Sequence, residues 1–144
     1  VYQLMAVKTK HPEYLEQARK VASFIKNHPN LPEDRVPYWD FDAPDIPNAP
    51  RDASAAAVMA SAFIELCQLD KSSEAAGWLS LAEEQIRSLS SAEYLAEPGT
   101  NGGFILKHSV GNYNKNSEED VPLTYADYYY VEALLRLKKL QNEN

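Results

Sequence analysis

The sequence predicts an all-α protein in which inner and outer helices alternate around a ring. Three observations support this: helical periodicity dominates the chain, strongly apolar helices alternate with amphipathic ones, and short links alternate with long ones. A flat bundle needs only amphipathic helices, whereas an inner helix of a ring is touched by neighbours on every side. We therefore expect concentric layers of helices.

Two segments, residues 12–27 and 73–89, have the one-sided pattern of a surface helix. In each, apolar side chains recur at helical spacing and charged side chains occupy the opposite face. Pro12 suits the first turn of the earlier helix, because its missing N–H would have no helical partner there. Both helices are expected to bury one face only.

Two other segments lack a polar face, which predicts helices buried on all sides. Residues 53–64 read ASAAAVMASAFI without a charge, and residues 124–140 (TYADYYYVEALLRLKKL) carry most of their charge toward their end. Asp52 is a natural N-cap for the first helix. Thr124 and Asp127 have the spacing of a capping box at the start of the second, with Asp in place of the usual Glu or Gln.

The links between these helices alternate in length. The links from inner to outer helices are short, whereas residues 28–51 (the first link) and 90–123 (the second link) are much longer than common connections. Since successive helices alternate in direction, both long links should emerge on one face, beside the N-terminal ends of the inner helices. Those ends favour anions, so this face is the predicted binding cleft.

Composition narrows the possible partners. A net charge of −7, a pI near 4.9 and the absence of any basic run argue against nucleic acid and anionic membrane as partners. The three histidines are scattered and Cys67 is the one cysteine, so the sequence predicts no metal site and no disulfide. No apolar run is long enough to span a bilayer. We expect a soluble protein, and the sequence does not distinguish a cytoplasmic from a periplasmic location.

The first link is rich in carboxylates. Within VPYWDFDAPDIPNAPRDASAAA (residues 36–57), a pair of aspartates could perform general acid–base chemistry, as two carboxyl groups do in glycosidases. The alternative assigns Asp52 to helix capping, and Asp40, Asp42 and Asp45 to turns. We favour this alternative, because Asp is common at caps and turns whatever the function.

Three residues of the long links are candidate substrate contacts: Trp39, Arg51 and His108. Arg51 could clamp a substrate carboxylate or pair with Asp40 or Asp42. Trp39, like the tyrosines at 128–130, could stack on a sugar face or belong to the core. His108 could contact substrate, or be exposed or bonded to the backbone.

Several long strings resemble a known family. VPYWDFDAPDIPNAPRDASAAA, then GGFILKHSVG, then DVPLTYADYYYVEALLRL resemble the C-terminal portion of glycoside hydrolase family 88, the unsaturated glucuronyl hydrolases. The resemblance covers essentially the whole chain. It implies an (α/α) toroid of six helical hairpins, of which this chain holds about five of the twelve helices. Residues 1–144 are then predicted to be a single C-terminal fragment of the catalytic domain. The opening VYQLMAVK, which reads as the tail of an inner helix, also predicts that the N-terminus is not native.

The resemblance also implies an activity. Family members act on oligosaccharides left by polysaccharide lyases, which end in a 4,5-unsaturated uronic acid. An Asp protonates C4 and assists addition of water at C5, and the resulting hemiketal rearranges and releases the remaining sugar, with no metal or organic cofactor. The two catalytic aspartates and the R-G-Q-A-W-type pocket segment lie in the family's N-terminal half, and nothing in this sequence matches them. We therefore assign no catalytic residue and expect this chain alone to be inactive.

Two alternatives remain open. The unsaturated rhamnogalacturonyl hydrolases share the toroid, although the W-D-F-D-A-P string favours the glucuronyl hydrolases. The second alternative is not an enzyme: the chain could be a free-standing carbohydrate-binding or interaction module. In either case a partial ring leaves apolar flanks uncovered on VYQLMAV and on the helix at 125–140. We expect these flanks to cause self-association or pairing with the missing N-terminal piece.

Overall fold

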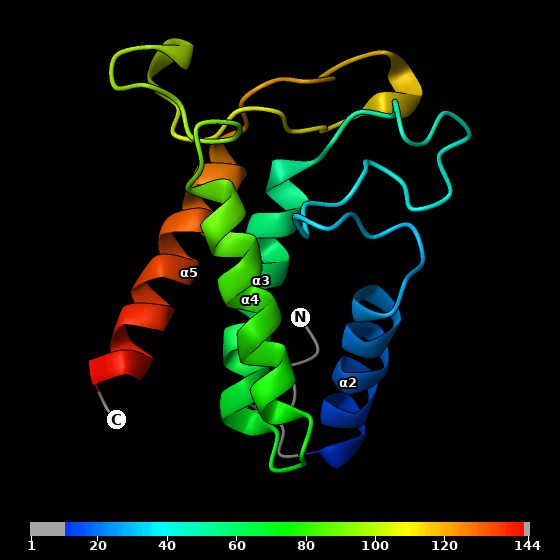
Figure 1. Ribbon diagram of the computed structural model, residues 1–144, viewed down its shortest axis with the longest axis vertical. Helices are drawn as coiled ribbons and strands as arrows, with labels where there is room; N and C mark the ends of the chain where they lie inside the picture. Colours follow the sequence, from blue (N-terminus) through cyan, green and yellow to red (C-terminus); the bar gives the residue numbers. More distant parts are fainter. Residues whose placement is uncertain (1–10, 143–144) are drawn as a thin grey trace.

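The computed structural model describes residues 11–142, and within that range the chain is all-helical (Figure 1). The four α-helices are α2 (Pro12–Lys26), α3 (Ala53–Leu69), α4 (Ala75–Leu89) and α5 (Thr124–Asn142). The second link adds two short 3₁₀ turns and, in the described residues, isolated bridges rather than β-strands. The all-α prediction is confirmed. The inner helix expected in VYQLMAVK lies outside the described residues.

Local chemistry sets most helix ends where the sequence predicts them. Pro12 occupies the first turn of α2, and the Asp52 carboxylate caps α3 by accepting the Ser54 backbone N–H at 3.0 Å. At the start of α5 the outcome differs from the expected capping box. The Asp127 carboxylate accepts hydrogen bonds from the backbone N–H groups of Ile105 and Leu106 in the second link. This aspartate therefore joins a helix to a loop.

Helix α3 is the centre of the described arc. It packs closely along α4 and along α5 and touches α2 over a smaller area, as Figure 1 shows. The alanines at 53, 56, 57 and 60 are fully buried, which allows the close helix approach that their small side chains predict. The prediction that α3 is enclosed by neighbours holds for most of its surface.

Helix α5 departs from the same prediction. Only Ala126, Tyr130 and Ala133 are buried, whereas the side chains of Tyr128 and Leu135 are 61% exposed. The reason is that α5 packs mainly on α3, and no other described helix covers its remaining faces. The expectation of burial on all sides is wrong for α5 in this chain, and the expected uncovered flank is observed.

A buried carboxylate ties α2 and α4 to the end of α3. Asp70, the C-cap of α3, has a fully buried side chain that accepts two hydrogen bonds from Arg19, at 2.6 and 3.0 Å, and one from the Trp78 indole N–H at 2.9 Å. Burial opposes ionisation, but the hydrogen bonds from Arg19, Trp78 and Ser72 outweigh it and hold the pKa of Asp70 well below its ordinary value.

Both long links lie at the same end of the helices, at the top of Figure 1. Two of their contacts join them directly: the Trp39 and Tyr113 rings stack, and the Tyr94 hydroxyl donates to Asp34 at 2.9 Å. At the start of α3, the Ala53 backbone N–H donates to the His108 carbonyl at 2.9 Å, which ties the second link to that helix. The prediction that both links emerge on one face is confirmed. Among the described residues, no helix is long and apolar enough to cross a membrane.

Candidate functional site

A pocket of about 330 Å³ opens where the two long links meet. Two of the three predicted site residues, Arg51 and His108, line it together. The other lining residues are Asn48, Ala49, Pro50, Glu93, Tyr94 and Asp120. The tertiary fold therefore brings together one predicted residue from each link, Arg51 and His108, as a cleft formed by both links requires.

Arg51 is held in place by the start of the first link. Its Nε and Nη2 donate to the Val36 carbonyl at 3.0 and 2.7 Å, and Nη2 also pairs with the Asp34 carboxylate. The guanidinium lies over the Tyr38 ring, 5.1 Å from its centroid. Of the two expectations for Arg51, pairing with Asp40 or Asp42 is wrong, because the partner is Asp34.

His108 sits at a constrained point of the second link. Its φ of 60° lies in the left-handed region, and its Nδ1 is 2.6 Å from the Asp120 carboxylate. The ring meets Tyr94 edge-on, with centroids 6.1 Å apart. Its side chain remains 36% exposed, so the imidazole is accessible from the pocket that it shares with Arg51.

Trp39, the third predicted residue, does not line this pocket. Its ring stacks on Tyr113 with centroids 4.0 Å apart and planes 19° from parallel. Among the described residues its buried indole Nε1 has no hydrogen-bond partner. The stack joins the two links, so Trp39 shapes the loop face from a point outside the pocket of Arg51 and His108.

Two of the aspartates considered above, Asp40 and Asp52, behave as a turn residue and a cap residue. The Asp40 carboxylate accepts the Asp42 backbone N–H at 2.9 Å, and Asp52 caps α3. The N-terminal end of α3 thus faces the chain's own carboxylate, Asp52. The described residues contain no cluster of His, Cys, Asp or Glu able to hold a metal ion.

Sequence reasoning missed two residues that organise the pocket wall. Asp34 binds Arg51 through one carboxylate oxygen and the Tyr94 hydroxyl through the other. Tyr94 is buried, and this burial, together with the neighbouring Asp34, raises the pKa of its hydroxyl despite the opposing charge of Arg51. The signal was weak: a charged run, EDR at 33–35, and one tyrosine in a polar stretch.

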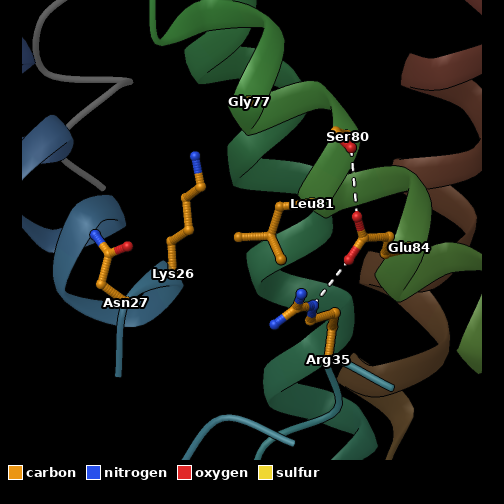
Figure 2. A pocket seen from close by; sticks show the side chains of 7 residues that line it. All are labelled: Lys26, Asn27, Arg35, Gly77, Ser80, Leu81 and Glu84. Atoms are coloured by element: carbon orange, nitrogen blue, oxygen red, sulfur yellow. Dashed lines mark hydrogen bonds and ion pairs between the residues drawn. The ribbon is translucent and has the colours of Figure 1, made fainter. Parts of the chain in front are cut away.

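A smaller pocket of about 200 Å³ lies between the end of α2 and α4 (Figure 2). Two of its charged side chains pair with each other: Arg35 lies 2.8 Å from Glu84, and Glu84 also accepts the Ser80 hydroxyl at 3.3 Å. Lys26 lies over the Trp78 ring, 5.2 Å from its centroid. These contacts join α2, the first link and α4, and none involves a predicted site residue.

Comparison with known proteins identifies the family. No protein-family profile matches the sequence. Among characterised proteins, the chain is 47% identical over 132 residues to the unsaturated glucuronyl hydrolase of Formosa agariphila, a match covering 92% of this chain and 32% of that protein. It is 35% identical over 129 residues to the unsaturated glucuronyl hydrolase of Bacillus sp. (strain GL1), covering 88% and 33%. The chain belongs to the unsaturated glucuronyl hydrolases. It spans about a third of the length of the relatives it matches.

The solved structures agree with this assignment. An unsaturated glucuronyl hydrolase specific for heparin superposes with a TM-score of 0.94 at 48% identity, covering 98% of this chain and 38% of that one. Unsaturated glucuronyl hydrolases fold as an (α/α) toroid, so the predicted fold class, a partial toroid, is confirmed. That residues 1–144 form a single C-terminal fragment stays a prediction.

Proposed function

We propose that this chain forms part of an unsaturated glucuronyl hydrolase, which hydrates the 4,5-double bond of an unsaturated glucuronic acid at the non-reducing end of lyase-generated oligosaccharides. The supporting observation is the 47% identity to an enzyme of that name across 92% of the chain. Protonation of C4 and addition of water at C5 are assigned to aspartates outside this sequence. The chain alone is therefore inactive.

The part played by this chain is to build one wall of the substrate cleft. Arg51 and His108 supply a cation and an imidazole on the pocket between the two links, where a uronate carboxylate or sugar hydroxyls would be bound. Trp39, stacked on Tyr113, keeps the links together beside this pocket. In this proposal Arg51 and His108 bind the sugar, Trp39 shapes the pocket, and none of the three transfers a proton.

The open face of α5 is where the rest of the enzyme packs. A third pocket, of about 600 Å³, follows this face along Thr124, Tyr128, Val131 and Leu135, and Asp127 and Glu132 also line it. An apolar stripe of this kind on a protein in water is normally covered. When the rest of the enzyme is absent, a second copy of the chain covers the stripe and the chain self-associates.

A chimera tests the activity. In it, this chain replaces the matching third of the Formosa agariphila enzyme, and the loss of unsaturated-uronate absorbance is followed with a lyase-generated disaccharide. We expect the chimera to be active and the isolated chain to be inactive. A chimera that folds, as judged by circular dichroism and a cooperative melting transition, yet consumes no substrate would contradict the proposal.

Light scattering tests the association. The isolated chain should be larger than a monomer at micromolar concentration, and adding the other two thirds of the Formosa agariphila enzyme as a separate polypeptide should convert it to a mixed complex. If the chain is a monodisperse monomer and does not bind the added polypeptide, this part of the proposal is wrong.

A further inference from the structure

The second link carries His108 across the N-terminal ends of two neighbouring inner helices. Two aspartates, one on each helix, hold the backbone of this crossing segment (residues 104–110). Neither aspartate lines the pocket of Arg51 and His108. Their contacts nevertheless fix the path of the segment that brings His108 to it.

Asp127, in the first turn of α5, provides the first anchor. One of its carboxylate oxygens accepts the Ile105 backbone N–H at 2.8 Å, and the other accepts the Leu106 backbone N–H at 2.9 Å. These distances are those of good charge-assisted hydrogen bonds. The side chain of Leu106 is fully buried beside Ala126, so this anchor is also tied into the core.

The N-terminal end of α3 provides the second anchor. The Asp52 oxygen that caps α3 also accepts the Val110 backbone N–H at 3.3 Å. The next residue of the helix, Ala53, donates its backbone N–H to the His108 carbonyl at 2.9 Å. The crossing segment is thus held on both sides of His108.

Between these anchors His108 adopts a backbone conformation that side-chain-bearing residues rarely take. Its φ is 60°, in the left-handed region that favours glycine. A residue stays in this region when its surroundings determine its position. Here the bonds to Asp127, Asp52 and Ala53 act together with the bond from the Lys107 N–H to the Tyr94 carbonyl and the two backbone bonds between Ser109 and Val121. The result is an imidazole that faces the pocket shared with Arg51.

We propose that Asp127 is a positioning residue for substrate binding: through its two bonds to the crossing segment it helps to fix the place of His108 in the pocket that His108 shares with Arg51. This inference rests on the proposed function, since it assigns His108 a role in binding the unsaturated sugar. It gives a use to an aspartate that the sequence suggests is only a helix cap.

The kinetic test uses Asp127→Asn in the active chimera. An amide offers one acceptor oxygen and places an NH₂ group against one of the two N–H donors, so one bond is lost with little change in shape. We expect KM to rise about 10-fold and kcat to change by less than about 3-fold, because a small displacement of a binding group costs affinity. The matched control is Asp45→Asn, an exposed aspartate of the first link, which should leave both constants unchanged.

A double-mutant cycle separates positioning from a general structural role. If Asp127 acts through His108, the effect of Asp127→Asn on KM should largely disappear in a His108→Ala background. Equal effects of Asp127→Asn in both backgrounds would overturn the inference, as would a His108→Ala chimera with an unchanged KM.

Hydrogen exchange on the isolated chain gives a readout without activity. The Ile105 and Leu106 amides should exchange at least about 10-fold faster in Asp127→Asn than in the unchanged chain or in Asp45→Asn. Unchanged exchange of these two amides would overturn the inference about Asp127 and would leave the proposed function standing. An inactive chimera carrying the unchanged chain would overturn the proposed function, and the role of Asp127 in binding with it.

Discussion

Helices α3 and α5 look alike in sequence but differ in their surroundings. Both are apolar around most of their circumference, and both are expected to be inner helices of a ring. In the structure α3 has nine buried residues, whereas α5 has three. Helix α3 has neighbours on several sides, and α5 packs mainly on α3. Apolar composition therefore predicts that a helix needs neighbours, whereas the packing within this chain decides how many it has.

The sharpest test of this comparison is one substitution made on both helices. Leu66 on α3 is fully buried, and Leu135 on α5 is 61% exposed. Leu66→Ala should lower the free energy of unfolding by about 2–5 kcal/mol, because it leaves a cavity in the core. Leu135→Ala should change it by less than about 0.5 kcal/mol. Urea denaturation measures both, and comparable losses would mean that α5 is as enclosed as α3.

The next largest effect concerns the buried carboxylate at the end of α3. Asp70→Asn should lower the free energy of unfolding by about 2 kcal/mol at neutral pH, since it weakens the bonds from Arg19 and Trp78. The pH dependence follows from the lowered pKa of Asp70 in the folded state. Below about pH 4 the unfolded chain takes up a proton that the folded chain does not, so stability falls as the pH falls.

Denaturation from pH 7 to pH 3 checks this dependence. The unchanged chain should lose stability more steeply with acid than Asp70→Asn does. Equal slopes for the two proteins would show that other carboxylates account for the loss.

A smaller effect is expected where α3 and α5 meet. Arg136 on α5 lies 3.4 Å from Glu65 on α3 and 3.6 Å from Glu132, and all three side chains are partly exposed. Because solvent screens such pairs, Arg136→Ala should cost about 0.5–1 kcal/mol, and less at 1 M salt. A loss like that of Asp70→Asn, with no salt dependence, would show that this seam is as well enclosed as the end of α3.

The smallest effect on stability should come with the clearest effect on association. Tyr128→Ser removes a large exposed aromatic side chain from the open stripe of α5, so the monomer should be about as stable as before but self-associate more weakly. Phe24→Ser is the matched control, because Phe24 on α2 has the same 61% exposure. Analytical ultracentrifugation over a concentration series compares them. Equal weakening by both substitutions would argue against α5 as the specific contact.

Sequence patterns predicted the described helices to within a few residues, because apolar periodicity and caps act over short distances. Asp52 was correctly expected to cap α3, since an N-cap bonds within its own first turn. Asp127 has similar local chemistry, yet it bonds Ile105 and Leu106 from the second link. No local pattern distinguishes these two uses of an aspartate.

In the candidate site, too, the sequence predicted some features and not others. Composition and link length placed Arg51 and His108 on one face, and the structure brings them to one pocket. The partner of Arg51 was expected among Asp40 and Asp42, which are near in sequence, but it is Asp34. Trp39 was a third candidate contact, and it stacks on Tyr113 outside the pocket of Arg51 and His108. Bonds between the two links depend on how the loops fold over the helix ends, which side-chain chemistry alone does not specify.

Spacing and polarity along single segments were enough to predict the helices, their inner or outer character and the face on which both long links emerge. Tertiary structure alone decided which carboxylates anchor the second link, which residue holds Arg51, and which apolar helix remains open. Those outcomes depend on distances between segments far apart in the chain, and such distances are set only when the helices pack.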